Sequence, residues 1–122
     1  MKKLLIILLL ISPFSFADWG DVYYCQEISH AITDNNGKIR KVELSTFQFK
    51  LDETKNAMVF GSSGRLAEKV VPLREGEELG FPWWFAEDDL RRIYFREGTG
   101  KFLEAGTGAL NAWLMSANCD KF

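Results

Sequence analysis

Apolar and polar residues alternate along most of the chain in short segments, with turn residues between them about every ten positions. The turns are rich in Gly, Asn and Asp, which favour tight reversals of the backbone. This pattern predicts an all-β fold of about eight antiparallel strands. The expected strands cover about residues 22–33, 38–51, 57–60, 65–73, 81–85, 90–96, 101–105 and 109–119.

The second expected strand, from about Lys38 to Leu51, changes phase along its length. Val42 and Leu44 occupy one phase, whereas Phe47, Phe49 and Leu51 occupy the other. Because successive side chains of a strand point to opposite faces, such a change predicts a bulge or bend near Ser45–Thr46. Bends of this kind allow a sheet to curl upon itself.

The N-terminus has a different pattern from the rest of the chain. Lys2 and Lys3 precede an apolar run from Leu4 to Ile11, and Ser15-Phe16-Ala17 places small residues before a cleavage point at Asp18. These features predict a cleaved signal peptide over residues 1–17 and a single β domain over residues 18–122. The alternative is a membrane anchor, which needs about 20 apolar residues. We therefore expect a periplasmic or secreted protein with no membrane insertion after cleavage.

Two cysteines, Cys25 and Cys119, remain in an exported chain of this kind. One disulfide between them is the simplest interpretation, and two free thiols are the alternative. A disulfide would bring the first and last strands together. An up-and-down meander whose end strands meet is a closed or nearly closed barrel.

The first strand has two possible orientations. Val22, Tyr24, Ile28 and Ile32 share a phase that also contains Gln26 and His30. Either the strand has a bulge near Gln26, or Tyr23 and Cys25 point inward while Gln26 and His30 point outward. The second arrangement is favoured around Cys25, because it keeps polar residues out of the core.

Charge excludes some classes of partner. Without Lys2 and Lys3, 13 basic and 17 acidic residues remain, a net charge of −4. This argues against nucleic acid, which requires a concentrated basic face. We expect a monomer that needs no cofactor.

Aromatic residues are the main candidates for contact with a ligand or partner. If Phe81, Trp83 and Phe85 point into the core, alternation places Trp84 on the outside or at a mouth of the barrel. The alternative places Trp84 beneath the acidic loop 74–80. Trp19, just after the cleavage point, is expected to plug one end of the barrel.

The sequence lacks a catalytic or metal-binding pattern. His30 is the only histidine, and Ser62 and Ser63 lack the context of a nucleophile elbow. The turn acids Glu87, Asp88 and Asp89 are expected to be solvated or to pair with the basic residues that follow them. We therefore expect a protein that is not an enzyme and holds no metal.

Four stretches, DWGDVYYCQ, FQFKLDETKNAMVFG, IYFREGTGKFLEAG and the terminal NCDKF, resemble short signal-bearing exported proteins of marine bacteria. Tyr24-Cys25 and the late Cys119 also resemble the outline of periplasmic inhibitors of c-type lysozyme. That family has a serine-glycine-x-x-tyrosine loop, and here Ser63-Gly64 is followed by Ala67 where the tyrosine would stand. The first resemblance implies no activity, and the second implies an eight-stranded barrel that inhibits a hydrolase.

These observations favour an exported, non-catalytic small β-barrel protein that binds a small apolar ligand or a partner protein. The alternative is a periplasmic inhibitor of a hydrolase such as lysozyme.

Overall fold

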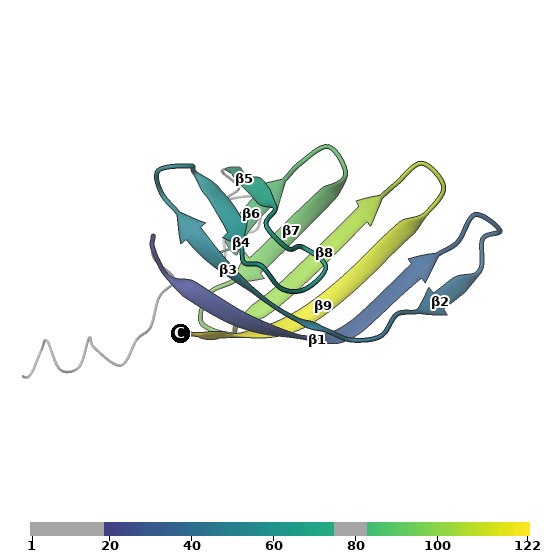
Figure 1. The fold of residues 1–122 in the computed structure, drawn as a ribbon, viewed down its shortest axis with the longest axis horizontal. Coiled ribbons are helices and arrows are strands. Elements are labelled where there is room, and N and C mark those ends of the chain that lie inside the picture. Colours follow the sequence, from purple (N-terminus) through teal and green to yellow (C-terminus); the bar gives the residue numbers. More distant parts are fainter. Residues whose placement is uncertain (1–18, 75–82) are drawn as a thin grey trace, which may run out of the picture.

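The computed structural model describes residues 19–74 and 83–122, and this part of the chain is an antiparallel β-barrel (Figure 1). The strands are β1 (Val22–Thr33), β2 (Ile39–Lys41), β3 (Thr46–Asp52), β4 (Ala57–Phe60), β5 (Val70–Arg74), β6 (Trp83–Glu87), β7 (Arg91–Arg96), β8 (Lys101–Thr107) and β9 (Ala112–Lys121). Eight of them close the barrel in the order β1-β3-β4-β5-β6-β7-β8-β9, and β9 pairs again with β1. The predicted fold class is therefore confirmed, with β2 as an extra strand.

The predicted break in the second strand is also confirmed, and it is wider than expected. The segment 42–45 separates β2 from β3. As a result, β1 pairs with β3 only from Val22 to Gln26, and its last residues, Ala31 to Thr33, pair with β2. The strand expected from residue 65 starts later, at Val70, because residues 61–69 form a loop.

The disulfide is the closing seam of the barrel. Cys25 and Cys119 are directly opposite each other in the β1–β9 pairing and are joined by an S–S bond of 2.04 Å. Gly100 approaches this seam so closely that a Cβ atom there would lie 2.1 Å from the carbonyl oxygen of Cys119. The β7–β8 turn can therefore pack against the seam only with glycine at this position.

Aromatic side chains fill the barrel around the disulfide. We call this part the closed half, since strands pair around its whole circumference. Phe49 contacts the rings of Tyr23, Phe60, Phe95 and Phe102, with centroids 5.1–5.8 Å apart. The other buried residues of the closed half are Cys25, Phe47, Leu51, Met58, Leu66, Val71, Leu73, Ala86, Ile93, Ala117 and Cys119.

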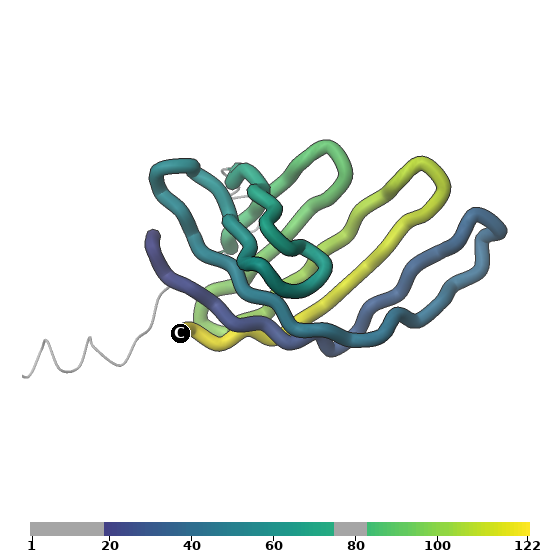
Figure 2. Tube along the Cα trace, viewed as in Figure 1, coloured from purple at the N-terminus to yellow at the C-terminus, as the bar shows by residue number. Residues whose placement is uncertain are grey.

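The other part of the barrel, which we call the open half, consists of the strand ends that extend past β3 and β4. They are the second half of β1 from Glu27, β2, the end of β8 from Glu104, the start of β9 up to Met115, and the β6–β7 turn with Arg91. Figure 2 shows the β6–β7, β8–β9 and β1–β2 turns following one another along this side of the molecule. In the described residues, no helix has the length and hydropathy of a membrane span.

Candidate functional site

A β-bulge in β1 creates the candidate site. Glu27 is opposite Ala117, whereas Ser29 is opposite Ser116, so β1 contains one extra residue, Ile28. Ile28 and Ser29 both lie on the exposed outer face. The extra residue reverses the alternation, and both Glu27 and His30 therefore point into the barrel.

The sequence left two arrangements open for β1, a bulge or an inward phase containing Tyr23 and Cys25. The structure has features of both. Tyr23 and Cys25 point inward and Gln26 points outward, as favoured around Cys25. The outward orientation of His30 was wrong, because the bulge between Glu27 and Ser29 returns His30 to the interior. The bulge considered near Gln26 does exist, and it lies between Glu27 and Ser29.

The Glu27 carboxylate is only 2% exposed and is surrounded by donors. Ser45 donates its backbone N–H to Oε1 at 3.3 Å and its hydroxyl to Oε2 at 2.9 Å. His30 Nδ1 lies 3.2 Å from Oε1, and Arg65 Nε lies 3.7 Å from Oε2. The break between β2 and β3 makes this possible, since it places Ser45 beside Glu27 rather than in a regular strand.

Glu104 is the second buried carboxylate. Trp113 donates its indole N–H to Glu104 Oε1 at 2.9 Å, and the Arg91 guanidinium lies 3.7 Å from the same oxygen. Burial raises the pKa of Glu104, while the Trp113 hydrogen bond and the charges of Arg91 and His30 oppose this shift. Arg91 Nε also lies 3.2 Å from Asp88 Oδ2, which makes an ion pair without a hydrogen bond from Nε.

These groups form one cluster, which we call the polar cluster: Glu27, His30, Arg91, Glu104 and Trp113. The first four are all of the buried polar or charged residues in the described ranges. They come from β1, β7 and β8, and all lie in the open half. Burying four such groups is unfavourable unless they find partners. Here Glu27 is bonded to His30 and Ser45, and Glu104 to Trp113 with Arg91 beside it, while the two sets interact through their charges.

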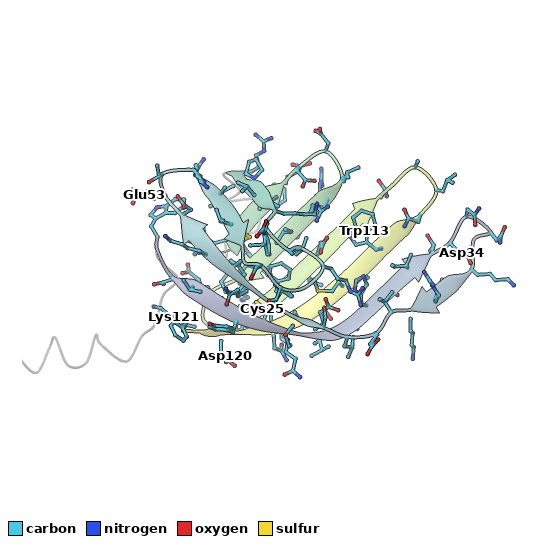
Figure 3. The ribbon with its side chains drawn as sticks, viewed as in Figure 1. Cys25, Asp34, Glu53, Trp113, Asp120 and Lys121 are labelled. Atoms are coloured by element: carbon cyan, nitrogen blue, oxygen red, sulfur yellow. A yellow bond between two sulfur atoms is a disulfide. The ribbon has the colours of Figure 1, made fainter. Side chains whose placement is uncertain are left out.

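The Trp113 side chain, labelled in Figure 3, extends from β9 over Gly106 of β8. A Cβ atom on Gly106 would lie 2.2 Å from the indole ring, so the ring occupies the space that a side chain would fill. The ring borders a cleft of about 480 Å³ between the β6–β7 and β8–β9 turns. The cleft is lined by Glu87, Asp88, Asp89, Leu90, Arg91, Arg92, Ala105, Gly106, Thr107, Ala112 and Trp113.

A second cavity, of about 470 Å³, lies on the other side of the open half. It is lined by Gln26, Glu27, Leu44, Ser45, Thr46, Ser63 and Gly64. Two irregular segments, the β2–β3 break and the β4–β5 loop, thus leave the barrel wall accessible beside Glu27.

The condition for an outward Trp84, with Trp83 and Phe85 in the core, is not met. The alternative, Trp84 beneath the loop 74–80, involves residues 75–80, which lie outside the described residues. Trp84 points inward with Ala86 and packs against the core, while Trp83 and Phe85 lie on the opposite face beside Tyr94. Alternation defines two phases but not which faces the core. Phe81 lies outside the described residues, and contact of any of these residues with a ligand or partner remains a prediction.

Trp19 contacts the core, and its role as a plug of one barrel end remains a prediction. Its ring packs edge-to-face on Trp84, with the centroids 5.1 Å apart, and against the core of the closed half. The pairing expected between the acidic and basic blocks also occurs, with Glu87 3.2 Å from Arg92 and Asp88 3.2 Å from Arg91.

Sequence reasoning missed Glu27, Arg91 and Glu104. A signal was present for all three: Arg91 shares the phase of Ile93 and Phe95, and Glu104 shares that of Phe102. Glu27 shares the phase of Tyr23 and Cys25, which the sequence favoured as the inward one. A charged residue in an apolar phase indicates either a strand end or a buried polar group.

No family model, curated protein or solved structure matches this chain. Within residues 19–74 and 83–122, no three His, Cys, Asp or Glu side chains are grouped so as to hold a metal ion. The polar cluster can accept and donate hydrogen bonds, and its arrangement is the basis for the proposals below.

Proposed function

We propose that the mature chain is an exported, non-catalytic β-barrel protein that binds a partner molecule with its open half. The contrast between the two halves carries this proposal. Aromatic rings occupy the interior of the closed half, whereas the open half has two accessible cavities beside buried polar side chains. Few, fixed polar groups next to a cavity are typical of ligand sites.

The order of the bonds around Glu27 supports a non-catalytic role. In a nucleophilic triad, the histidine lies between the hydroxyl group and the carboxylate and takes the proton of the hydroxyl. Here the carboxylate lies between Ser45 and His30. The Ser45 proton therefore points to Glu27, and His30 has no hydrogen bond to that hydroxyl.

The filled core also distinguishes between the two kinds of partner that the sequence suggested. A small apolar ligand would need space within the barrel, and Phe49, Phe95 and Phe102 are at most 1% exposed there. A partner that docks on the rim needs no such space. The packing therefore favours docking at the open half.

Site-specific cross-linking tests this proposal. A photoreactive p-benzoylphenylalanine replaces Leu110 in the β8–β9 turn or, as the matched control, Lys55 in the exposed β3–β4 turn of the closed half. After illumination in the producing cells, we expect a defined adduct from position 110 and none from position 55. Adducts from both positions in equal amount, or none from position 110, would contradict docking at the open half.

Export is tested on the same preparation. The disulfide is compatible with an oxidising compartment, where structural disulfides persist. Intact-mass measurement of protein recovered from the periplasm or medium is expected to give a chain that begins at Asp18. A full-length mass with residues 1–17 retained would overturn the signal-peptide prediction.

A hydrolase inhibitor is the second candidate, and the β4–β5 loop favours it. Ser62, Ser63 and Gly64 are exposed at the rim, and Gly64 has a left-handed φ of 84° that holds the loop against β3. A rigid exposed loop is suited to entering a substrate cleft. The test measures cell-wall hydrolysis by c-type lysozyme with the mature protein in excess. An undiminished rate of hydrolysis would exclude this particular target.

A further inference from the structure

The Trp113 indole is held in one position before any ligand arrives. Its N–H is bonded to the buried Glu104 carboxylate, its ring occupies the space above Gly106, and the Arg91 guanidinium carbon is 6.0 Å from the ring centroid. An aromatic surface fixed in this way loses little side-chain entropy on binding. The half-buried ring is therefore a preorganised aromatic surface at the edge of the 480 Å³ cleft.

The charges around this aromatic surface are largely paired. Five charged residues line the cleft, and four of them form two ion pairs, Arg91 with Asp88 and Arg92 with Glu87. The cleft thus offers donors and acceptors in fixed places, with little excess charge to attract an ion. Arg91 already occupies the cation position beside the indole, which disfavours a cationic ligand.

A fixed aromatic ring with balanced polar groups at its edge fits a ligand that is apolar on one face and rich in hydroxyl groups at its edges. Pyranose sugars commonly have this shape, with C–H groups exposed on one face of the ring and hydroxyl groups around its edge. Carboxylate and guanidinium groups bond adjacent hydroxyls in pairs. The cleft volume lies within the range of small-ligand sites, roughly 300–1,000 Å³.

We propose that the cleft between the β6–β7 and β8–β9 turns binds an uncharged carbohydrate, with one pyranose ring packed against the exposed part of Trp113. Arg92, Asp89 and Thr107 are placed to bond its hydroxyls, and Leu90 extends the apolar floor. This inference rests on the proposed binding role of the open half and names its ligand class.

Nuclear magnetic resonance titration of the ¹⁵N-labelled mature protein tests the inference directly. The probes are three neutral trisaccharides, built from glucose, galactose or N-acetylglucosamine. We expect at least one to shift the Trp113 indole N–H and the Leu90 and Thr107 amide signals saturably, with the Trp83 indole signal unchanged as an internal control. No saturable shift with any of the three, or shifts confined to other regions, would overturn the proposal.

Substitutions of cleft residues test whether the trisaccharide binds in the cleft. Trp113→Ala is expected to weaken binding by at least about tenfold, as for a central aromatic contact. If this variant does not fold, Arg92→Ala and Thr107→Val test the exposed rim, and each is expected to weaken binding several-fold. Arg74→Ala, an exposed arginine on the outer face of β5, is the matched control. Equal affinity of the Arg92, Thr107 and Arg74 variants would overturn the assignment.

The outcome separates this inference from the function on which it rests. A failed titration together with an adduct at position 110 would overturn carbohydrate binding alone. Release of shorter sugars from a bound trisaccharide, followed by chromatography, would instead contradict the non-catalytic role while the ligand class stands.

Discussion

Around the disulfide, aromatic rings fill the interior of the barrel, whereas charged side chains take the equivalent inward positions around Glu27 and Glu104. One strand, β1, passes through both regions. It contributes Tyr23 and Cys25 to the closed half, and Glu27 and His30 to the open half. Burial raises the pKa of Tyr23 to about 12, with the charges of Asp21 and Glu97 adding to the shift.

The difference between the halves follows from how the barrel wall is built. Where β1 pairs with β3 and β9 on its two sides, its backbone groups bond to those strands, and its inward side chains are those of Tyr23 and Cys25. Where the bulge and the 42–45 break interrupt this pairing, backbone and hydroxyl groups of Ser45 become available to Glu27. Irregular pairing thus permits a polar interior, and we expect the closed half to carry the stability and the open half the binding.

The largest effect is expected from a cavity in the closed half. Phe49→Ala removes a ring in contact with four others and should destabilise the fold by about 3–5 kcal/mol. Tyr24→Ala, an exposed aromatic of β1, is the control and should cost much less. Urea unfolding monitored by circular dichroism measures both, and equal losses would remove the distinction between inner and outer faces.

Loss of the seam is expected to have the next largest effect. The double substitution Cys25→Ala with Cys119→Ala opens a loop of 94 residues in sequence separation and should destabilise by about 2–4 kcal/mol. The β-sheet signal should persist, because the β1–β9 hydrogen bonds remain. An unchanged melting temperature would mean that the seam does not hold the closed half together.

A smaller effect is expected in the open half. Glu27→Gln removes the charge that faces Ser45, His30 and Arg65, and should destabilise by about 1–3 kcal/mol. Glu43→Gln changes an exposed carboxylate of the neighbouring segment and should have little effect. Urea unfolding measures both variants. If they have the same free energy of unfolding, the hydrogen bonds of Glu27 contribute no more to stability than an exposed charge does.

The smallest effect concerns pH. Because the pKa of Glu104 is raised in the fold, its proton is held more tightly there than in the unfolded chain. The stability contributed by this group is complete below the ordinary value of 4.5 and falls as pH rises towards the raised value. Glu104→Gln should therefore lessen the loss of stability between pH 4.5 and neutrality, as measured by urea midpoints. Glu53→Gln is the exposed control, and the same change in slope for both would contradict this assignment.

Several features could be predicted because they depend on local chemistry. The Asp34-to-Gly37 and Asp52-to-Asn56 turns lie where Asp, Asn and Gly predicted them, with Asp34 and Asp52 accepting backbone N–H bonds. The break near Ser45 was visible as a change of phase. The orientation of Trp84 was not predictable, since Trp83, Trp84 and Phe85 suit either face equally well and the pairing of Ala86 with Ile93 decides it.

The sequence by itself determined the all-β class and most of the strands, and it indicated the two cysteines as the closing pair and hence the barrel. Only the tertiary structure decided that β1 reverses its phase at Glu27–Ser29 and that Glu27, Arg91, Glu104 and Trp113 meet in one cluster. Alternation along a strand is local, and it leaves two equivalent phases until neighbouring strands bury one of them. The polar cluster joins residues from β1, β7, β8 and β9, so its existence depends on contacts that no single segment of the chain contains.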